Sequence, residues 1–145
     1  MPPFLKELYM SSYNGKVYRK QGAKELVVDN GAKVTTVAGG YVLQSVATVA
    51  AAGSLQTDAA PIIAELNIVT GADGTKGVVL PVAQIGMMIT VKSTQAGQTL
   101  KVWPSPGGVI NAIAQDNPIV MGALTCAFFN ATSATQWYTT PLLPS

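Results

Sequence analysis

The stretch LKVWPSPGGVINAIAQDNPIVMGALTCAFFNATSATQWYTT, residues 100–140, decides the fold. Short apolar runs in it alternate with breaks that are rich in Pro, Gly, Asn, Asp and Ser. Runs of that length, rich in Val, Ile, Thr and aromatic residues and bounded by turn residues, are typical of successive antiparallel strands. The stretch therefore predicts β structure, and no set of residues in it is arranged for catalysis.

The chain just before this stretch continues the same pattern. IIAELNIVT (62–70), GVVLP (77–81) and MMITVKST (87–94) are strand-like runs separated by glycine-rich turns. Turn signals recur at roughly 8 to 12 residues without a helical period among them, which is typical of all-β sandwiches and barrels. We predict an antiparallel β-sandwich or jelly-roll-like module over residues 53–145, and we find no internal repeat of the kind that marks solenoids.

The first half of the chain divides into two further segments. Residues 1–22 are predicted to be an N-terminal arm, with a short helical turn suggested by the four-residue spacing of Leu5, Tyr9 and Tyr13. Residues 23–52 are predicted to be a hairpin and a connecting segment, because ELVVDNGAKVTTV (25–37) places Asp-Asn-Gly between two β-branched runs. The pattern of residues 41–52 fits a helix and a strand equally well.

Composition indicates a domain whose surface is partly covered by other chains. The 145 residues are 48% hydrophobic and only 11% charged, well below the usual quarter. So few charges leave a surface that is largely neutral or apolar, and we expect oligomer or partner contacts on part of it. A single cysteine, the lack of a secretory signal pattern and the lack of a long apolar run favour a protein made in a reducing cytoplasm, with no membrane partner.

Positive charge is concentrated at the amino-terminal end. Residues 1–33 hold six Lys or Arg against three acidic residues, and residues 34–145 hold three against four. These cations are too dilute to predict a nucleic-acid partner. Together with apolar neighbours they are candidate contacts of the arm with another protein, and the candidate set is Tyr9, Tyr13, Lys16, Val17, Tyr18, Arg19 and Lys20.

The sequence shows no pattern of residues that is typical of a catalytic or metal-binding site. The chain contains no histidine, which excludes Ser-His-Asp catalysis and histidine-ligated zinc. Asp73 and Asp116 lie in turn sequences, where an aspartate side chain usually caps backbone groups. Cys126 lies in an apolar run and is interpreted as a small core residue. We therefore predict a chain that is not an enzyme, with no catalytic residue, metal, cofactor or small-molecule substrate.

Trp103, Trp137 and Tyr138 leave two interpretations open. Aromatic residues in strands are usually core or interface residues. The alternative is an aromatic platform on which a sugar ring stacks, which needs polar groups converging beside the rings.

The order of motifs between residues 50 and 140 resembles a β module that recurs in structural proteins of tailed bacteriophages. GVVLP (77–81) is followed by ITVKSTQAGQTLKVWP (89–104), GGVINAIAQDNPI (107–119) and AFFNATSATQWYT (127–139), in that order and at that spacing. Residues 1–49 carry no such resemblance. The module occurs in head decoration (cement) proteins, in head fibres, and in tail fibres and collars.

A short chain with an arm is most similar to a decoration protein. The resemblance implies a homotrimer with a β-sandwich or jelly-roll body, located on the capsid surface of a virion and made in the cytoplasm of the host bacterium. Its partner would be the major capsid protein of the same phage. The alternative that the resemblance implies is a receptor- or carbohydrate-binding module of a head fibre, tail fibre or collar.

Overall fold

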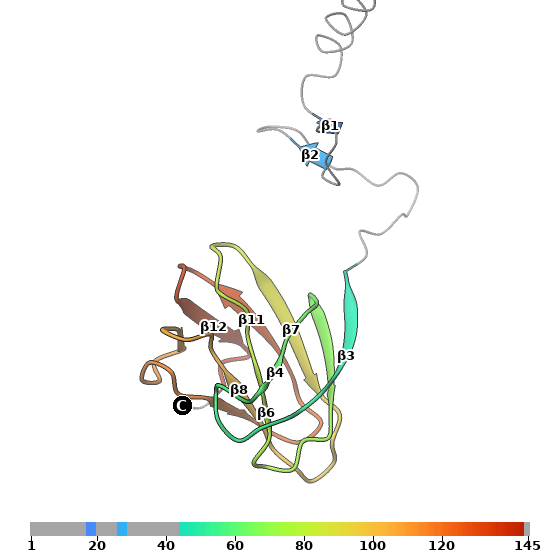
Figure 1. Cartoon of the computed structure of the whole chain (residues 1–145), viewed down its shortest axis with the longest axis vertical. Coiled ribbons are helices and arrows are strands. Elements are labelled where there is room, and N and C mark those ends of the chain that lie inside the picture. Colours follow the sequence, from blue (N-terminus) through green and yellow to red (C-terminus); the bar gives the residue numbers. More distant parts are fainter. Residues whose placement is uncertain (1–16, 20–25, 29–43, 144–145) are drawn as a thin grey trace, which may run out of the picture. The chain divides into compact units, whose positions relative to one another are not determined.

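The computed structural model describes residues 17–19, 26–28 and 44–143. The chain separates into two compact units, Met1–Val42 and Leu43–Ser145, which are described one at a time (Figure 1).

The first unit contains one antiparallel strand pair. β1 (Val17–Arg19) runs against β2 (Leu26–Val28), with Val17 opposite Val28 and Arg19 opposite Leu26. The first strand of the hairpin predicted over residues 25–37 is present as β2, and its described partner is β1. The predicted helical turn at 5–13 and the return strand at 33–37 lie outside the described residues.

The second unit is built from strands, and its described residues contain no helix. Its strands are β3 (Val46–Ala50), β4 (Ala60–Pro61), β5 (Leu66–Thr70), β6 (Gly77–Val79), β7 (Met88–Ser93), β8 (Leu100–Trp103), β9 (Val109–Ile110), β10 (Ile119–Met121), β11 (Cys126–Ala131) and β12 (Gln136–Thr140). The prediction of an all-β protein is confirmed, and the ambiguous segment 41–52 contains the strand β3.

The first six of these strands wind alternately between two sheets. β3, β5 and β7 lie side by side and parallel in a six-stranded sheet, while β4, β6 and β8 do the same in a four-stranded sheet. A strand of the six-stranded sheet and the next strand in the chain, which lies in the four-stranded sheet, together form one coil, as in a β-solenoid. Val46 lies opposite Leu66, and Leu66 lies opposite Thr90, so the registers are offset by 20 and then 24 residues.

The winding changes after β8. β10 runs antiparallel to β8, and β11 runs antiparallel to β7, so both sheets reverse direction at this point. β12 then forms a hairpin with β11 and lies beside the short parallel strand β9 at the far edge of the six-stranded sheet. The two sheets enclose one hydrophobic core.

The predicted antiparallel, jelly-roll-like arrangement is wrong in strand direction. Five of the eight strand pairings in this unit are parallel. A parallel connection needs a long crossover, and here a strand of the opposite sheet makes that crossover. Apolar alternation and turn residues indicate where a strand lies but not the direction of its partner, which is why the sequence suggested a different topology.

Buried polar side chains hold the chain at two corners. The carboxamide oxygen of Asn67 accepts the backbone N–H groups of Ile63 and Ala64 at 3.4 and 3.2 Å, and its amide nitrogen donates to the carbonyl of Ala64 at 2.6 Å. Asn111 adopts φ 53° after β9, and its oxygen accepts the N–H of Thr139 at 2.9 Å. Both side chains satisfy backbone groups that would otherwise be buried without a partner.

Candidate functional site

The outer face of the six-stranded sheet is the surface most suited to binding. Side chains alternate between the two faces of a strand. Ile89 and Val91 of β7 are buried, so the residues that alternate with them along β7, and the strand partners of those residues, lie on the opposite face of the sheet. One outward row runs Val46, Leu66, Thr90, Phe128 and Thr140 across five strands, a second runs Met88, Asn130 and Tyr138, and a third runs Thr48, Ile68, Lys92 and Cys126.

Large apolar side chains in these rows are open to solvent. Val46 is 59% exposed, Met88 46%, Phe128 43% and Tyr138 47%. Met88, Phe128, Asn130 and Thr140 line a shallow hollow of about 310 Å³ on this face. An apolar surface that extends over several neighbouring strands is unusual on an isolated domain and marks an interaction site. We call these three rows the outer face.

A larger open cavity adjoins the outer face at the ends of β3, β5 and β7. It has a volume of about 660 Å³ and shares Met88 with the hollow described above. Ile63 and Ile85, which line it, are 73% and 79% exposed. The apolar surface therefore continues from the outer face around this end of the domain.

A single carboxylate contributes charge to this cavity. Glu65 accepts hydrogen bonds from the backbone N–H of Ser45 at 2.8 Å and from its hydroxyl at 3.3 Å. The Ser45 hydroxyl accepts the backbone N–H of Glu65 at 3.0 Å. These contacts join the start of β3 to the start of β5, and they give Glu65 a structural function in closing the first coil.

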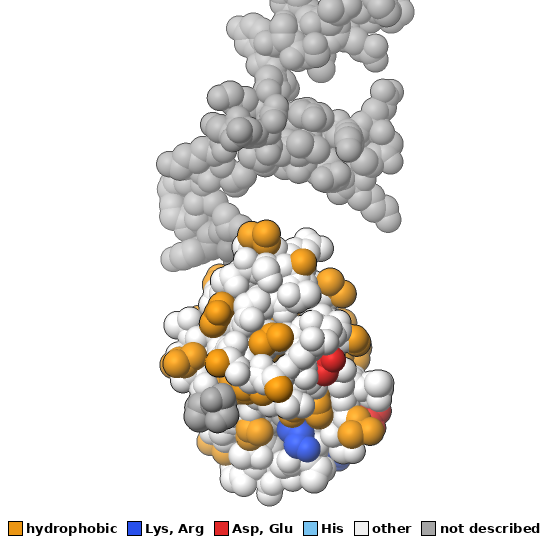
Figure 2. Space-filling view, turned by 90° about the vertical axis from the view of Figure 1, so that its left-hand side faces the viewer, with side chains coloured by type: hydrophobic (Ala, Val, Ile, Leu, Met, Phe, Trp, Pro, Cys, Tyr) orange, Lys and Arg blue, Asp and Glu red, His pale blue; other side chains and the backbone are white. Residues whose placement is uncertain are grey.

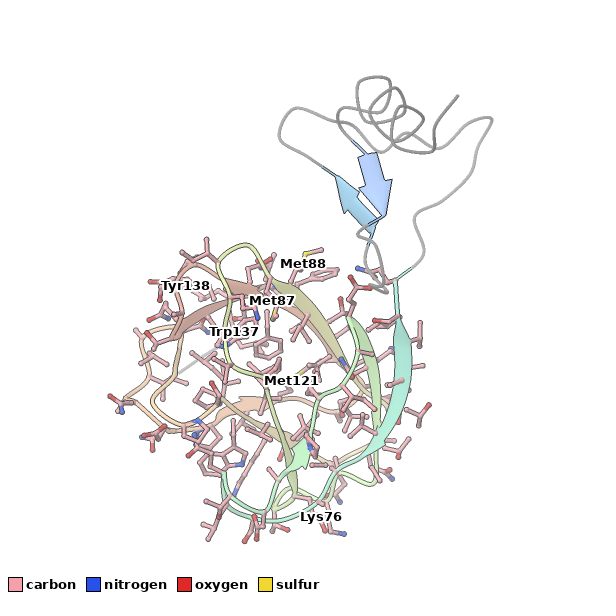
Figure 3. All side chains as sticks on the ribbon, turned by 45° about the horizontal axis from the view of Figure 1, so that its top comes forward. Lys76, Met87, Met88, Met121, Trp137 and Tyr138 are labelled. Atoms are coloured by element: carbon pink, nitrogen blue, oxygen red, sulfur yellow. The ribbon has the colours of Figure 1, made fainter. Side chains whose placement is uncertain are left out.

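The three aromatic residues of the proposed sugar platform do not share a surface. Trp137 is fully buried and Tyr138, its neighbour on β12, points to the outer face. Trp103 is half-buried on β8 in the other sheet. Figure 3 shows Trp137 and Met121 between the sheets, with Met88 and Tyr138 at the periphery. The core interpretation of Trp137 is confirmed, and a platform formed by all three rings does not exist in this fold.

The candidate contacts of the arm are only partly described. Val17, Tyr18 and Arg19 form β1, where Tyr18 lies opposite Val27 of β2. Tyr9, Tyr13, Lys16 and Lys20 lie outside the described residues. Their predicted contact with another protein stays a prediction.

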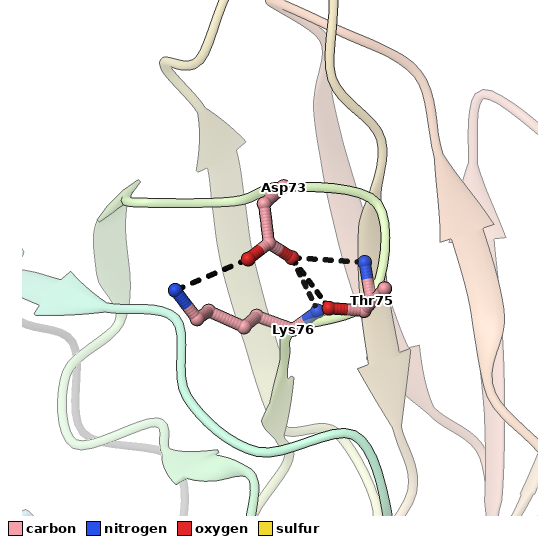
Figure 4. A network of polar contacts seen from close by, with 3 residues as sticks. All are labelled: Asp73, Thr75 and Lys76. Atoms are coloured by element: carbon pink, nitrogen blue, oxygen red, sulfur yellow. Dashed lines mark hydrogen bonds and ion pairs between the residues drawn. The ribbon is translucent and has the colours of Figure 1, made fainter.

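Asp73 is a turn-forming residue, as its sequence context predicted. One carboxylate oxygen accepts the backbone N–H groups of Thr75 and Lys76, both at 3.0 Å, and the Thr75 hydroxyl at 2.7 Å. The other oxygen pairs with the Lys76 ammonium at 3.1 Å (Figure 4). The Thr75 hydroxyl and these backbone donors hold the pKa of Asp73 well below its ordinary value.

Asp116 caps a second turn in the same manner. Its carboxylate accepts the side-chain amide of Gln56 at 3.1 Å and the backbone N–H of Gly107 at 2.6 Å. The Gln56 amide and then the Gly107 N–H lower the pKa of Asp116. Both aspartates are thus used in holding loops, and neither is arranged as a catalytic acid or base.

Charged groups are sparse over the described part of the second unit. The face in Figure 2 carries scattered apolar side chains and few charged ones. Within the described ranges, no three His, Cys, Asp or Glu side chains come together in a way that would hold a metal ion. In those same ranges, no helix is long and apolar enough to span a membrane.

Sequence reasoning did not find the outer face. Cys126 was interpreted as a core residue, but it is exposed on this face. The alternation of Phe128 with the buried Ala127 and Phe129 was the available signal, because it places one phenylalanine on each face of β11. Recognising a continuous surface needed the register of strands far apart in sequence.

Comparison with known proteins gives this chain no relative: it matches no family model, no curated protein and no solved structure.

Proposed function

We propose that this chain is a structural protein of a phage virion, which binds the exterior of the capsid shell and stabilises it. The observation that carries the proposal is that the residues of the motif series fall within the residues of the compact β unit. The motif series that resembles phage structural modules runs from residue 50 to 140, and the compact β unit runs from Leu43 to Ser145. The whole of that series therefore belongs to one folded body.

The proposed mechanism is physical and involves no reaction. A shell expands as DNA is packed into it, and a protein that bridges neighbouring capsomers adds interface area that opposes opening. An interface of standard size buries about 1,600 Å² in total, which is enough for specific binding. Several copies of one contact within a trimer would act multivalently, so that weak individual contacts hold firmly. The partner would be the major capsid protein of the same phage.

The arm is proposed as the segment that grips the shell. Its strand β1 (Val17–Arg19) presents backbone that adds to a sheet edge of the capsid protein. The apolar anchors would be Tyr9, Tyr13, Val17 and Tyr18, and acidic capsid surface would be faced by Lys16, Arg19 and Lys20. This division gives the basic end of the chain and its apolar body separate functions.

Co-sedimentation with purified phage heads tests this division. The full chain is expected to pellet with the heads, and a chain lacking residues 1–22 is expected to stay in the supernatant with an unchanged heat-unfolding transition of its β body. Binding that falls steeply with salt would fit the basic arm residues, since exposed charges are screened within about 10 Å at 0.1 M salt. Equal occupancy of the two chains on the heads would refute a gripping arm.

The alternative function, a receptor- or carbohydrate-binding module of a fibre or collar, receives less support from the geometry. Trp137 is buried in the core, so a glycan would have to be bound by Tyr138 or Trp103 separately.

A further inference from the structure

We propose that the outer face of the six-stranded sheet, together with the adjoining cavity rim, is the surface through which copies of this chain bind one another. The proposal deepens the trimeric assembly named above by identifying its interface. It is carried by the folded unit alone and does not depend on the arm or on a capsid.

Most of the exposed large apolar side chains lie on the outer face or at the cavity rim. Val46, Phe128 and Met88 lie on three strands of one sheet, Tyr138 lies next to them across Asn130, and Ile63 and Ile85 continue the surface around the cavity. These six are more than half of the eleven large apolar residues that are exposed in the described part of the chain. Burying them in an interface would remove more than half of these exposed large apolar residues from water.

The outer face alone supplies part of the area that a stable interface requires. Five strands spaced about 4.8 Å apart, with rows about 6.6 Å apart along each strand, make a face of about 400 Å². A standard interface covers about 800 Å² of each partner. The outer face therefore supplies about half of a standard interface, and the rim residues Ile63 and Ile85 extend it toward the full size.

The charge pattern favours a second copy over a different protein. Lys92 is the one charged residue of the three outward rows, and Glu65 is the one charged residue of the cavity rim. Partners of different sequence are usually selected by complementary charges, and this face offers almost none. Interfaces between identical subunits are apolar at their centre and depleted in charge.

Sedimentation velocity of the full chain, with matched lysine substitutions, tests the proposal. The natural sequence is expected to sediment as an oligomer between about 1 and 100 μM. Phe128→Lys is expected to weaken association at least tenfold, which corresponds to about 1.4 kcal/mol, because a buried ammonium would lack a partner. Val120→Lys is the matched control, since Val120 is 46% exposed on β10 of the opposite sheet. This variant is expected to associate like the natural chain.

Heat unfolding checks that each variant folds. If Phe128→Lys does not fold, Met88→Lys serves as a second variant, because Met88 is also 46% exposed. A monomeric natural chain over the whole concentration range would overturn the proposal. The proposal would also be overturned if Val120→Lys and Phe128→Lys weakened the association of the chain to the same extent. If the isolated chain is monomeric and Phe128→Lys instead loses binding to phage heads, the face belongs to the capsid partner and not to a second copy.

Discussion

At the scale of single residues, the loops of this domain are held by side chains whose function follows from their chemistry. Asp73 and Asp116 accept backbone N–H groups in their turns, as the turn-rich sequence around them predicted. Cys126 shows the limit of such reasoning, because an apolar neighbourhood in sequence does not tell which face of a strand a side chain occupies. Its exposure follows from the phase of β11, in which Ala127 and Phe129 point to the core.

Asp73→Asn is expected to remove a stabilisation that depends on pH. The folded pKa of Asp73 lies below its ordinary value of 3.8, so the folded state favours the charged carboxylate. This contribution is complete above the unfolded pKa and is lost as the pH falls through the folded pKa. The melting temperatures of the natural chain and the variant, measured from pH 6 to pH 2, should differ most at pH 6, and the difference should begin to shrink below about pH 4 and go on shrinking toward pH 2. A difference that stays constant over this range would contradict the assignment.

At the scale of elements, the positions of strands were predictable and their partners were not. LKVW and QWYT, two apolar runs of the 100–140 stretch, each form a strand as predicted, whereas the single run IVMGALTCAFF forms two strands in two different sheets. Their pairing depends on coils whose registers are offset by 20 and 24 residues. Since these lengths differ and the coils share no motif, no repeat was visible in the sequence.

Gly77 shows how closely two coils approach. It opens β6, pairs with Lys101 of β8 and exchanges backbone hydrogen bonds of 3.1 Å with Ala52. A Cβ at this position would lie 2.7 Å from the carbonyl oxygen of Lys101. Gly77→Ala is therefore expected to separate the strands and to lower the free energy of unfolding by about 1–3 kcal/mol, measured by urea denaturation.

Gly122→Ala is the control for this substitution, because the nearest atom to its added Cβ is the Thr125 methyl at 3.4 Å. Its effect should be smaller than that of Gly77→Ala. Equal losses in the two variants would show that the approach of β6 to β8 is not what requires the glycine.

At the scale of the whole molecule, the chain divides into a basic arm and an apolar, charge-poor body. The sequence predicted that part of the surface is covered by other chains, on the ground that only 11% of residues are charged. It could not indicate the outer face, since that face is assembled from β3, β5, β7, β11 and β12, which lie far apart in the sequence. The three rings do not form a sugar platform, for a related reason. Neighbouring residues of a strand, such as Trp137 and Tyr138, point to opposite faces of the sheet.

Locating the chain on a virion tests the proposed function most directly. Particles of the phage that encodes the chain would be labelled with gold-conjugated antibody raised against residues 44–143 and imaged by electron microscopy. If the chain binds the exterior of the capsid, the label is expected to be spread over the capsid surface. Label confined to the tail or collar, or particles that lack the protein, would contradict it.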